Sequence, residues 1–565
     1  MTYDIAILGG QVVDGTGAAP VRADVAISGD RIARVAAPGE LEGQATRTID
    51  ATGKLVTPGF IDIHTHLDAQ VMWDPVVSSP CWHGITSVVM GNCGLSLAPA
   101  SAEKLEFLVK TLESVEDIPA DAILAGSRFS GGSFGDYLDV LDGLPLGINL
   151  ATLVGHVAVR YEVMGERSME RTPATESEIE QMCALVDAGI RDGAFGFSTS
   201  RSLLHTTPDE RHVPGTFAET EELLALGKVL ERHGRGVYGS VPAVELGDAE
   251  LHRKEIAWMR EVSIATGRPF TFAVVQNREN PGLYREILDQ VAEANRAGAR
   301  LHPQTEVRSI GVVVGLANIT PFDQSLAWLT LKELTLDERL AALRDPERRS
   351  LLVREGNEAS GEAQLSLIHH LRLEDGNARY DFSPEQSLWA MAQERGVTPA
   401  DLFIDMELES QGNAWFIFPF ANFELDVVGE MLARPEMLLG LADSGAHVGQ
   451  ICDTSFSTFF LRYWVHEQGL FSVGDGIRKL TSEPAGFFGI EDRGVLREGM
   501  YADLNVFALD ALRVGLPEFT HDLPAGAGRF IQKATGFDYT LVNGEVFMEK
   551  GEHAGGLAGR LLRAS

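Results

Sequence analysis

The chain has few cysteines and no long apolar run. Its four cysteines, at positions 81, 93, 183 and 452, are too few and too scattered for a disulfide framework, which favours a reducing compartment. No apolar run approaches the roughly 20 residues that span a bilayer. The opening MTYDIAILGG lacks the basic start and apolar core of a signal peptide. We therefore expect a cytoplasmic protein.

Basic residues are also in short supply. The chain has 47 Lys and Arg against 81 Asp and Glu, a formal net charge of -34. Such a charge repels phosphate backbones and anionic membrane surfaces, and it keeps a large protein in solution. We therefore expect neither nucleic acid nor a membrane as a partner, and a small molecule as the ligand. The commonness of twofold assemblies favours a homodimer.

The two ends of the chain share one pattern. Residues 1–57 and 495–565 alternate short β-type runs with turn signals. Because neither segment is long enough to bury much surface alone, we predict that they pair into one small β-sandwich. Residues 58–494 would then form the larger domain, and 565 residues with 44% hydrophobic content are enough for both.

The middle of the chain alternates short apolar runs with long amphipathic stretches, which is typical of repeated βα units. Eight strands are predicted: FIDIHTH, ITSVVMGNC, INLATLVGH, AFGFSTS, GVYGSV, FTFAVVQ, RLHPQTEV and LLGLADSG. Helices are predicted near 101–115, 175–192, 218–233, 248–266 and 282–297. This order predicts an α/β fold, a (β/α)8 TIM-type barrel, whose catalytic residues lie at the carboxyl ends of the strands.

One connection is too long for a barrel. About 135 residues separate the seventh predicted strand from the eighth, where a helix and two loops need far fewer. Residues 309–436 therefore look like an insertion. The sequence leaves open whether it is a lid over the active site or a purely structural excursion.

Polar side chains follow the apolar strands at the predicted barrel mouth. His64 and His66 lie two residues apart, so both imidazoles point to the same side of a strand and can bind one ion. Imidazole suits zinc and similar divalent metals. Cys93 follows the second predicted strand and Asp443 the eighth. The pattern favours a metal site at this end of the strands.

Several of these motifs resemble a known family. VTPGFIDIHTHLD resembles the first metal-binding strand of the amidohydrolase superfamily, and DRGVLREGMYADLNVF and TLVNGEVF resemble its C-terminal β-unit. GNCG at 91–94, GHVAVRYEVMG at 155–165, GAFGFSTS at 193–200 and LADSGAH at 441–447 resemble the N-acyl-D-amino-acid deacylase, or D-aminoacylase, branch. The resemblance implies that Cys93 binds metal and that Asp443 lies beside the metal as general base and acid.

The chain departs from that branch at two strands. The branch has histidines at the ends of the fifth and sixth strands, whereas VYGSVPAVE and TFAVVQNRE contain none. Ser240 or Val241, and Gln276, stand at the expected positions. Three interpretations follow. One zinc, or another divalent ion, is held by His64, His66, Cys93 and Asp443; a different site is completed by His156, His302 or Glu306; or the metal is lost. The first is favoured, because four candidate ligands remain.

The resemblance also implies a substrate. It favours hydrolysis of the amide bond in N-acyl amino acids, of D configuration in the first instance. A substrate carboxylate needs a cation, and arginine offers a bidentate fork. Arg160, Arg201 and Arg308 each follow a predicted strand, and His156 could donate to an oxyanion. The alternatives are a hydrolase of another amide, a cyclic amide, a lactone or a carbamate, and a non-catalytic barrel.

Overall fold

The two ends of the chain form one sheet. The computed structural model describes residues 2–243 and 247–564. Nine strands join in this sheet: β1 (Tyr3–Val12), β2 (Val21–Ser28), β3 (Arg31–Ala36), β4 (Ala45–Asp50), β5 (Leu55–Pro58), β20 (Leu504–Phe507), β23 (Phe537–Val542), β24 (Glu545–Glu549) and β25 (Glu552–His553). The two ends meet where β5 pairs antiparallel with β20, with Thr57 opposite Asn505. Ile5 and Val25 share one buried cluster with Leu504 and Val506, so each end covers apolar surface of the other.

All eight predicted inner strands form, and they are parallel. They are β6 (Phe60–Asp62), β7 (Ile85–Met90), β8 (Asn149–Thr152) continued by β9 (Val154–Gly155), β10 (Gly196–Ser200), β11 (Val237–Val241), β12 (Phe270–Ala273), β13 (Leu301–Thr305) and β19 (Leu438–Leu439). One sheet has the order β6-β7-β8, and another the order β9-β10-β11-β12-β13-β19. A bridge between Thr65 and Ser444 links the segments that follow β6 and β19. The predicted α/β fold is confirmed.

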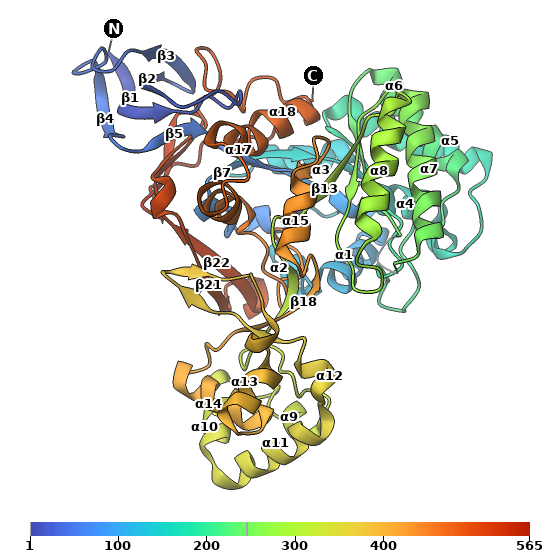
Figure 1. The fold of residues 1–565 in the computed structure, drawn as a ribbon. Helices are drawn as coiled ribbons and strands as arrows, with labels where there is room; N and C mark the ends of the chain where they lie inside the picture. The colour runs from blue at the N-terminus through green and yellow to red at the C-terminus, as the bar shows by residue number, and fades with distance from the viewer. Residues whose placement is uncertain (1, 244–246, 565) are drawn as a thin grey trace.

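The five predicted helices are also present. They are α1 (Ala102–Glu116), α5 (Glu176–Asp192), α6 (Thr220–His233), α7 (Ala249–Thr266) and α8 (Leu283–Arg296), of which the last four stand side by side in green in Figure 1. Helix α5 begins with a capping box, in which the Thr175 hydroxyl accepts from the Glu178 amide and the Glu178 carboxylate accepts from Thr175. Helix α8 buries Leu283, Ile287 and Val291 at helical spacing. Capping and periodicity made these helices readable from the sequence.

The remaining helices of this part of the chain are short. They are α2 (Ala120–Gly126), α3 (Phe134–Asp142), α4 (His156–Met164), α15 (Leu425–Leu432), α16 (Phe456–Phe459), α17 (Val473–Leu480) and α18 (Ser482–Phe488). A separate hairpin joins β21 (Arg513–Thr520) to β22 (Arg529–Thr535). Among residues 2–243 and 247–564, no helix combines the length and apolar character needed to cross a membrane.

The long connection between β13 and β19 forms a lobe with its own core, seen in yellow below the rest of the molecule in Figure 1. The chain enters it through β14 (Ile310–Val314) and returns through the antiparallel β18 (Phe416–Ala421). Between them lie α9 (Leu326–Leu329), α10 (Leu336–Arg344), α11 (Pro346–Ala359), α12 (Glu362–Leu365), β15 (His369–His370), β16 (Leu373–Glu374), β17 (Asn377–Ala378), α13 (Leu388–Arg395) and α14 (Pro399–Ser410). Trp328 and Phe403 are fully buried in this lobe. Helix α15 packs in the main core instead, so the separate core ends before this helix.

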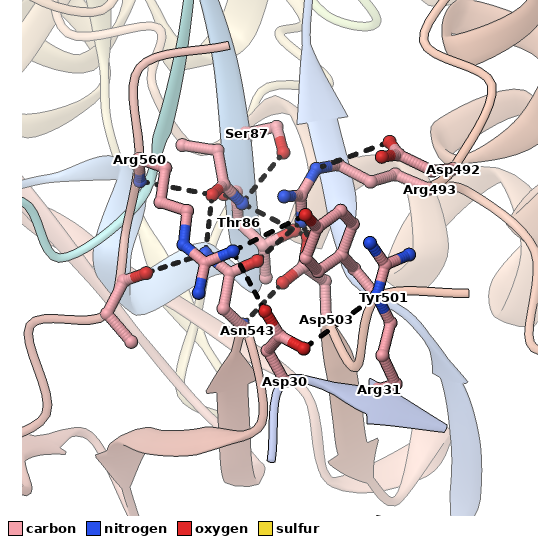
Figure 2. A network of polar contacts seen from close by, with 12 residues as sticks. Asp30, Arg31, Thr86, Ser87, Asp492, Arg493, Tyr501, Asp503, Asn543 and Arg560 are labelled. Atoms are coloured by element: carbon pink, nitrogen blue, oxygen red, sulfur yellow. Dashed lines mark hydrogen bonds and ion pairs between the residues drawn. The ribbon is translucent and has the colours of Figure 1, made fainter. Parts of the chain in front are cut away.

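Buried polar groups attach the terminal sheet to the inner strands. Asn149 of β8 donates to Asp503 (3.1 Å) and accepts from Asn543 (2.8 Å). The Arg493 guanidinium contacts Asp503 and donates to Asn543 (2.9 Å), as the network in Figure 2 shows. Tyr501 lies below Arg493, with its ring centroid 4.0 Å from the guanidinium carbon. These paired polar groups fix the position of the sheet, because an unpaired buried group would be costly.

Candidate metal centre

Four potential ligand atoms converge beyond the carboxyl ends of the inner strands. His64 and His66 follow β6, Cys93 follows β7, and Asp443 follows β19. The Cys93 Sγ lies 3.3 Å from Nε2 of His64 and 3.5 Å from Nε2 of His66. Asp443 Oδ1 lies 3.2 Å from the first of these nitrogens and 3.6 Å from the second. The ligand atoms of His64, His66 and Cys93 therefore lie within 4.8 Å of one another, and Asp443, which is far away in the sequence, lies beside the two imidazoles.

Each of these four separations is close to the edge of a tetrahedral metal site. With metal–ligand bonds of 2.0 to 2.3 Å, the edge of such a tetrahedron is roughly 3.4 Å. The four measured separations run from 3.2 to 3.6 Å. Oδ1 of Asp443 is buried and has no hydrogen-bond partner in the described part of the chain. An unpaired carboxylate oxygen facing two imidazoles is the arrangement that a divalent cation would satisfy.

The GNCG loop places Cys93 by means of its two glycines. Gly91 has φ +79°, and a Cβ there would lie 2.3 Å from the Leu153 carbonyl oxygen. Gly94 has φ +71°, and a Cβ there would lie 2.9 Å from the Ser200 amide nitrogen. Since only glycine tolerates both conditions, the loop can pack tightly against the next strands. Ser198 of β10 secures the loop, because its hydroxyl accepts from the Gly94 amide at 2.9 Å and contacts the Gly91 carbonyl.

Asp443 is more exposed than the two histidines beside it. Its side chain is 25% exposed, whereas those of His64 and His66 are 3% and 1% exposed. It also lines a cavity of about 30 Å³ together with Ser444, room for about one water molecule. Its backbone is in the left-handed region (φ +45°), a strained conformation that often marks functional positions. Asp443 is therefore the carboxylate of this group that can meet solvent or substrate.

Glu116, at the end of α1, supports one of the imidazoles from behind. Its Oε1 lies 3.4 Å from Nδ1 of His66, and its Oε2 lies 3.6 Å from Nε2 of His447. Its side chain is 2% exposed. Nδ1 of His66 has no hydrogen-bond partner in the described part of the chain, so Glu116 acts on this ring through its charge at ion-pair distance. A carboxylate behind a metal-binding imidazole raises the basicity of the ring. Sequence reasoning missed Glu116, because it stands in an amphipathic helix with several other acids.

The surroundings of these groups shift their pKa values in different directions. Burial opposes protonation of His66, but Glu116 and Cys93 outweigh it and raise the pKa of this imidazole well above its ordinary value. Burial lowers the pKa of His64 to about 4, which keeps it in the neutral form that binds metals. Burial raises the pKa of Cys93 to about 12, so its thiol stays protonated without a cation. Burial opposes ionisation of Asp443, but the His64 and His66 imidazoles outweigh it and hold the pKa of this carboxyl below its usual range. A cation would displace the thiol proton.

A further histidine lies beside the cluster. The ring of His205, in the loop after β10, makes a 2.9 Å hydrogen bond between its Nδ1 and the Ser200 hydroxyl. Burial lowers the pKa of His205 to about 3, helped by nearby His447 and His66. Its position in a loop gave no sequence signal beyond proximity to a strand end.

Two of the predicted substrate-binding residues are occupied by the protein itself. His156 is fully buried, and its ring bonds to Thr199 Oγ1 (2.8 Å) and to Glu222 Oε1 (2.9 Å). The Arg160 guanidinium, 2% exposed, donates from Nε to the same Glu222 oxygen at 2.9 Å. Both ring nitrogens of His156 are thus used. His156 and Arg160 of α4 bind Glu222 of α6, and these contacts link the two helices in the interior.

The other two arginines are engaged as well. Arg308 is fully buried, pairs with Asp453 at 3.0 Å and stacks over the Tyr380 ring at 3.8 Å. Arg201 pairs with Glu255 at 3.4 Å and donates to the Ala218 carbonyl at 2.6 Å, with a side chain 17% exposed. The structure brings neither into the group of four ligand atoms. Their partners were invisible in the sequence, because they lie on other elements.

Other residues stand at the two positions where the resemblance implies histidines. Ser240 on β11 is buried, and its hydroxyl has no partner within the described residues. The backbone and side chain of Gln276 bond to Asn422 and Glu424 where the lobe returns. Of the proposed substitutes, His156 is occupied, and His302 packs at 5.1 Å from the Phe487 ring.

Glu306 is the remaining substitute. It is fully buried, with 3.9 Å between its Oε1 and Nε of Arg308, and neither carboxylate oxygen has a hydrogen-bond partner in the described part of the chain. In residues 2–243 and 247–564, the His, Cys, Asp and Glu side chains close enough together to hold a metal comprise His64, His66 and Cys93.

The model of the amidohydrolase family matches residues 47–548. The chain belongs to the amidohydrolase family. It is 27% identical to a D-aminoacylase of Alcaligenes xylosoxydans xylosoxydans over 99% of this chain and 97% of that protein. It is 30% identical to an uncharacterized protein of Mycobacterium tuberculosis, over 90% of this chain and 84% of that protein.

A solved structure of a D-aminoacylase, described as having a binuclear metal centre, has 27% identity and a TM-score of 0.67, covering 99% of this chain and all of that one. The predicted family and its D-aminoacylase branch are thus confirmed. The chain is a metal-dependent hydrolase acting on amide C–N bonds, so this amidohydrolase is an enzyme and not a non-catalytic barrel.

Proposed function

We propose that this amidohydrolase cleaves the amide bond of N-acyl amino acids, with N-acyl-D-amino acids as the first series to test. The observation that carries the proposal is the convergence of His64, His66, Cys93 and Asp443 with separations of 3.2 to 3.6 Å. D-aminoacylase and N-acyl-D-aspartate deacylase, both of Alcaligenes xylosoxydans xylosoxydans, are 27% and 28% identical to the chain. Their names support the substrate class.

We further infer that the eight parallel strands close into the (β/α)8 barrel. The bridge between Thr65 and Ser444 and the run from β8 into β9 support closure. The terminal segments 1–57 and 495–565 would form a separate β-sandwich beside it, and the lobe would be an insertion in the barrel. This arrangement explains why the four side chains meet, because all follow carboxyl ends of strands.

The site would hold one divalent ion per chain, with zinc as the expected metal. Such an ion supplies an activated water and polarises the carbonyl of the substrate. Two neutral imidazoles and one thiolate leave room for further oxygen donors. The Asp443 side chain is more exposed than those of His64 and His66. It would accept a proton at a carboxylate oxygen and return it to the leaving nitrogen. Glu116 would hold the His66 ring in place.

A second candidate is a hydrolase of another amide, a cyclic amide, a lactone or a carbamate. It is favoured by the engagement of all four predicted substrate-binding residues. Glu222 binds both His156 and Arg160, Glu255 binds Arg201, and Asp453 binds Arg308. A substrate without a carboxylate would not need any of these arginines.

The first experiment is the metal content of purified protein by elemental mass spectrometry. We expect about one zinc per chain, lost in His64→Ala and Cys93→Ala. His521→Ala, which removes an exposed histidine, is the matched control and should keep the metal. If the wild type binds no metal after reconstitution, the proposal is wrong.

The second experiment is a substrate panel with the same protein. N-acyl-D- and N-acyl-L-amino acids, cyclic amides, lactones and carbamates should be compared with wild type and Asp443→Asn. We expect turnover of N-acyl-D-amino acids and a loss of about 10² to 10⁴ in kcat for the variant. Turnover of a neutral amide alone would favour the second candidate, and full activity of Asp443→Asn would exclude its role in proton transfer.

A further inference from the structure

A second cavity, of about 320 Å³, lies at the opposite end of the inner strands. It is lined by the turns that precede β11, β12 and β13, together with the end of α18. The metal-ligand candidates follow the carboxyl ends of the strands, whereas this cavity meets their amino ends. The two sites are therefore separated by the length of the sheet, and the second site plays no part in the proposed hydrolysis.

Three arginines line this cavity, one from each turn: Arg235, Arg268 and Arg300. They occupy equivalent places, because each follows a helix by a few residues and precedes the next strand by one or two. Aromatic and proline side chains form the adjoining wall: Phe195, Pro269, Phe487 and Phe488. Glu491 is the acidic residue of the lining.

No ion pair joins any of the three arginines to a described residue. That is unexpected in a chain with 81 acidic residues and 47 basic ones. The Nε atoms of Arg235 and Arg268 are buried without a hydrogen-bond partner in the described part of the chain. Burial and the neighbouring Arg300 charge lower the pKa of Arg268, so the second and third arginines repel each other. Buried unpaired donors and like charges are both costly.

Only part of their hydrogen-bonding capacity is used. Arg235 donates from Nη2 to the Ile190 carbonyl at 2.8 Å, and Arg300 donates from Nη1 to the Gly267 carbonyl at 3.3 Å. These bonds satisfy carbonyls at the ends of α5 and α7, a common role of arginine at helix C-termini. They leave Nε of Arg235 unpaired, and Nε of Arg268 also has no partner among the described residues.

We propose that this cavity binds a small, multiply charged oxyanion, such as a phosphate or polycarboxylate group. Guanidinium forks bind planar or tetrahedral oxyanions through paired N–H donors, and they tolerate burial better than an ammonium group. A bound oxyanion would relieve the repulsion between Arg268 and Arg300 and would supply the missing acceptors. The alternative is that the three arginines serve only the helix ends.

The test uses the full-length protein with inorganic phosphate, pyrophosphate and citrate as probes. Binding is measured by calorimetry and by the shift in Tm, at constant ionic strength with chloride as the reference. We expect at least one probe to bind with a Kd below about 1 mM and to raise the Tm. Phosphate or pyrophosphate binding would identify a phosphoryl site, and citrate binding alone a polycarboxylate site.

Arg268→Gln should weaken binding at least tenfold, and Arg300→Gln provides a second test in case the first variant is unstable. Arg296→Gln removes an exposed arginine of α8 outside the cavity lining and should bind as the wild type does. The proposal is overturned if no probe binds, if Arg296→Gln weakens binding as much as Arg268→Gln, or if both cavity variants bind normally.

Discussion

Replacing Glu116 with Gln tests whether the four side chains form a metal site supported from behind. The substitution keeps the shape of the side chain and removes the charge that lies 3.4 Å from Nδ1 of His66. Two unit charges at that distance attract by about 5 kcal/mol at an effective dielectric constant of 20. His66 carries only part of a charge when it binds metal, and the Gln amide can still accept a hydrogen bond. We therefore expect zinc affinity to fall by about tenfold to a hundredfold, the range for such supporting carboxylates.

The measurement is competition for zinc against a chelator of known affinity, at pH 7 and fixed ionic strength. Glu106→Gln is the matched control, because that exposed glutamate lies on the same helix and pairs with Lys110 at 2.7 Å. Its zinc affinity should equal that of the wild type. Circular dichroism of each variant separates loss of metal binding from loss of fold. Zinc affinity of Glu116→Gln within twofold of the wild type would refute the reasoning, since the carboxylate would then contribute nothing to the site.

Two predictions concern the lobe. Burial raises the pKa of Glu407 to about 8, above its ordinary 4.5, although the Leu316 amide donates to it at 2.8 Å. The folded state thus holds a proton that the unfolded state releases, so stability falls as the pH rises from about 4.5 to 8. Relative to Glu407→Gln, the wild type should lose about 3 kcal/mol between about pH 4.5 and pH 7, measured by urea unfolding; parallel pH profiles would contradict this. Trp328→Ala should destabilise the lobe by about 3 to 5 kcal/mol, because Trp328 is fully buried against Phe322 and Phe403. Calorimetry and limited proteolysis should show the lobe unfolding first, and a loss below about 1 kcal/mol would show that the site collapses around the cavity.

Much of the architecture could be predicted from local patterns. The eight inner strands and five helices were readable because apolar periodicity, caps and turn residues act over a few neighbouring positions. The capping box of Thr175 and Glu178 is an example. The lobe was detectable from length alone, but its core was not, because Trp328 and Phe403 are 75 residues apart (403 − 328) and meet only after folding.

The metal-ligand candidates were also visible in the sequence, since each follows an apolar run that ends at the same edge. His64, His66 and Cys93 lie in short motifs whose spacing and glycines have local physical causes. Their separations of 3.3 and 3.5 Å, and the support from Glu116, depend on how strands and α1 pack. No local pattern marks one acid among several on a helix.

Only the tertiary structure decides which of the predicted substrate-binding arginines are already paired with an acid. Arg160, Arg201 and Arg308 followed predicted strands and looked available for a substrate carboxylate. Each is neutralised by an acid from a distant element, and such a partner offsets the cost of burying a guanidinium. The sequence by itself determined which residues could do chemistry and at which end of the strands. Which of them are free to do it depends on long-range pairing, because the partners are set by packing and not by neighbours along the chain.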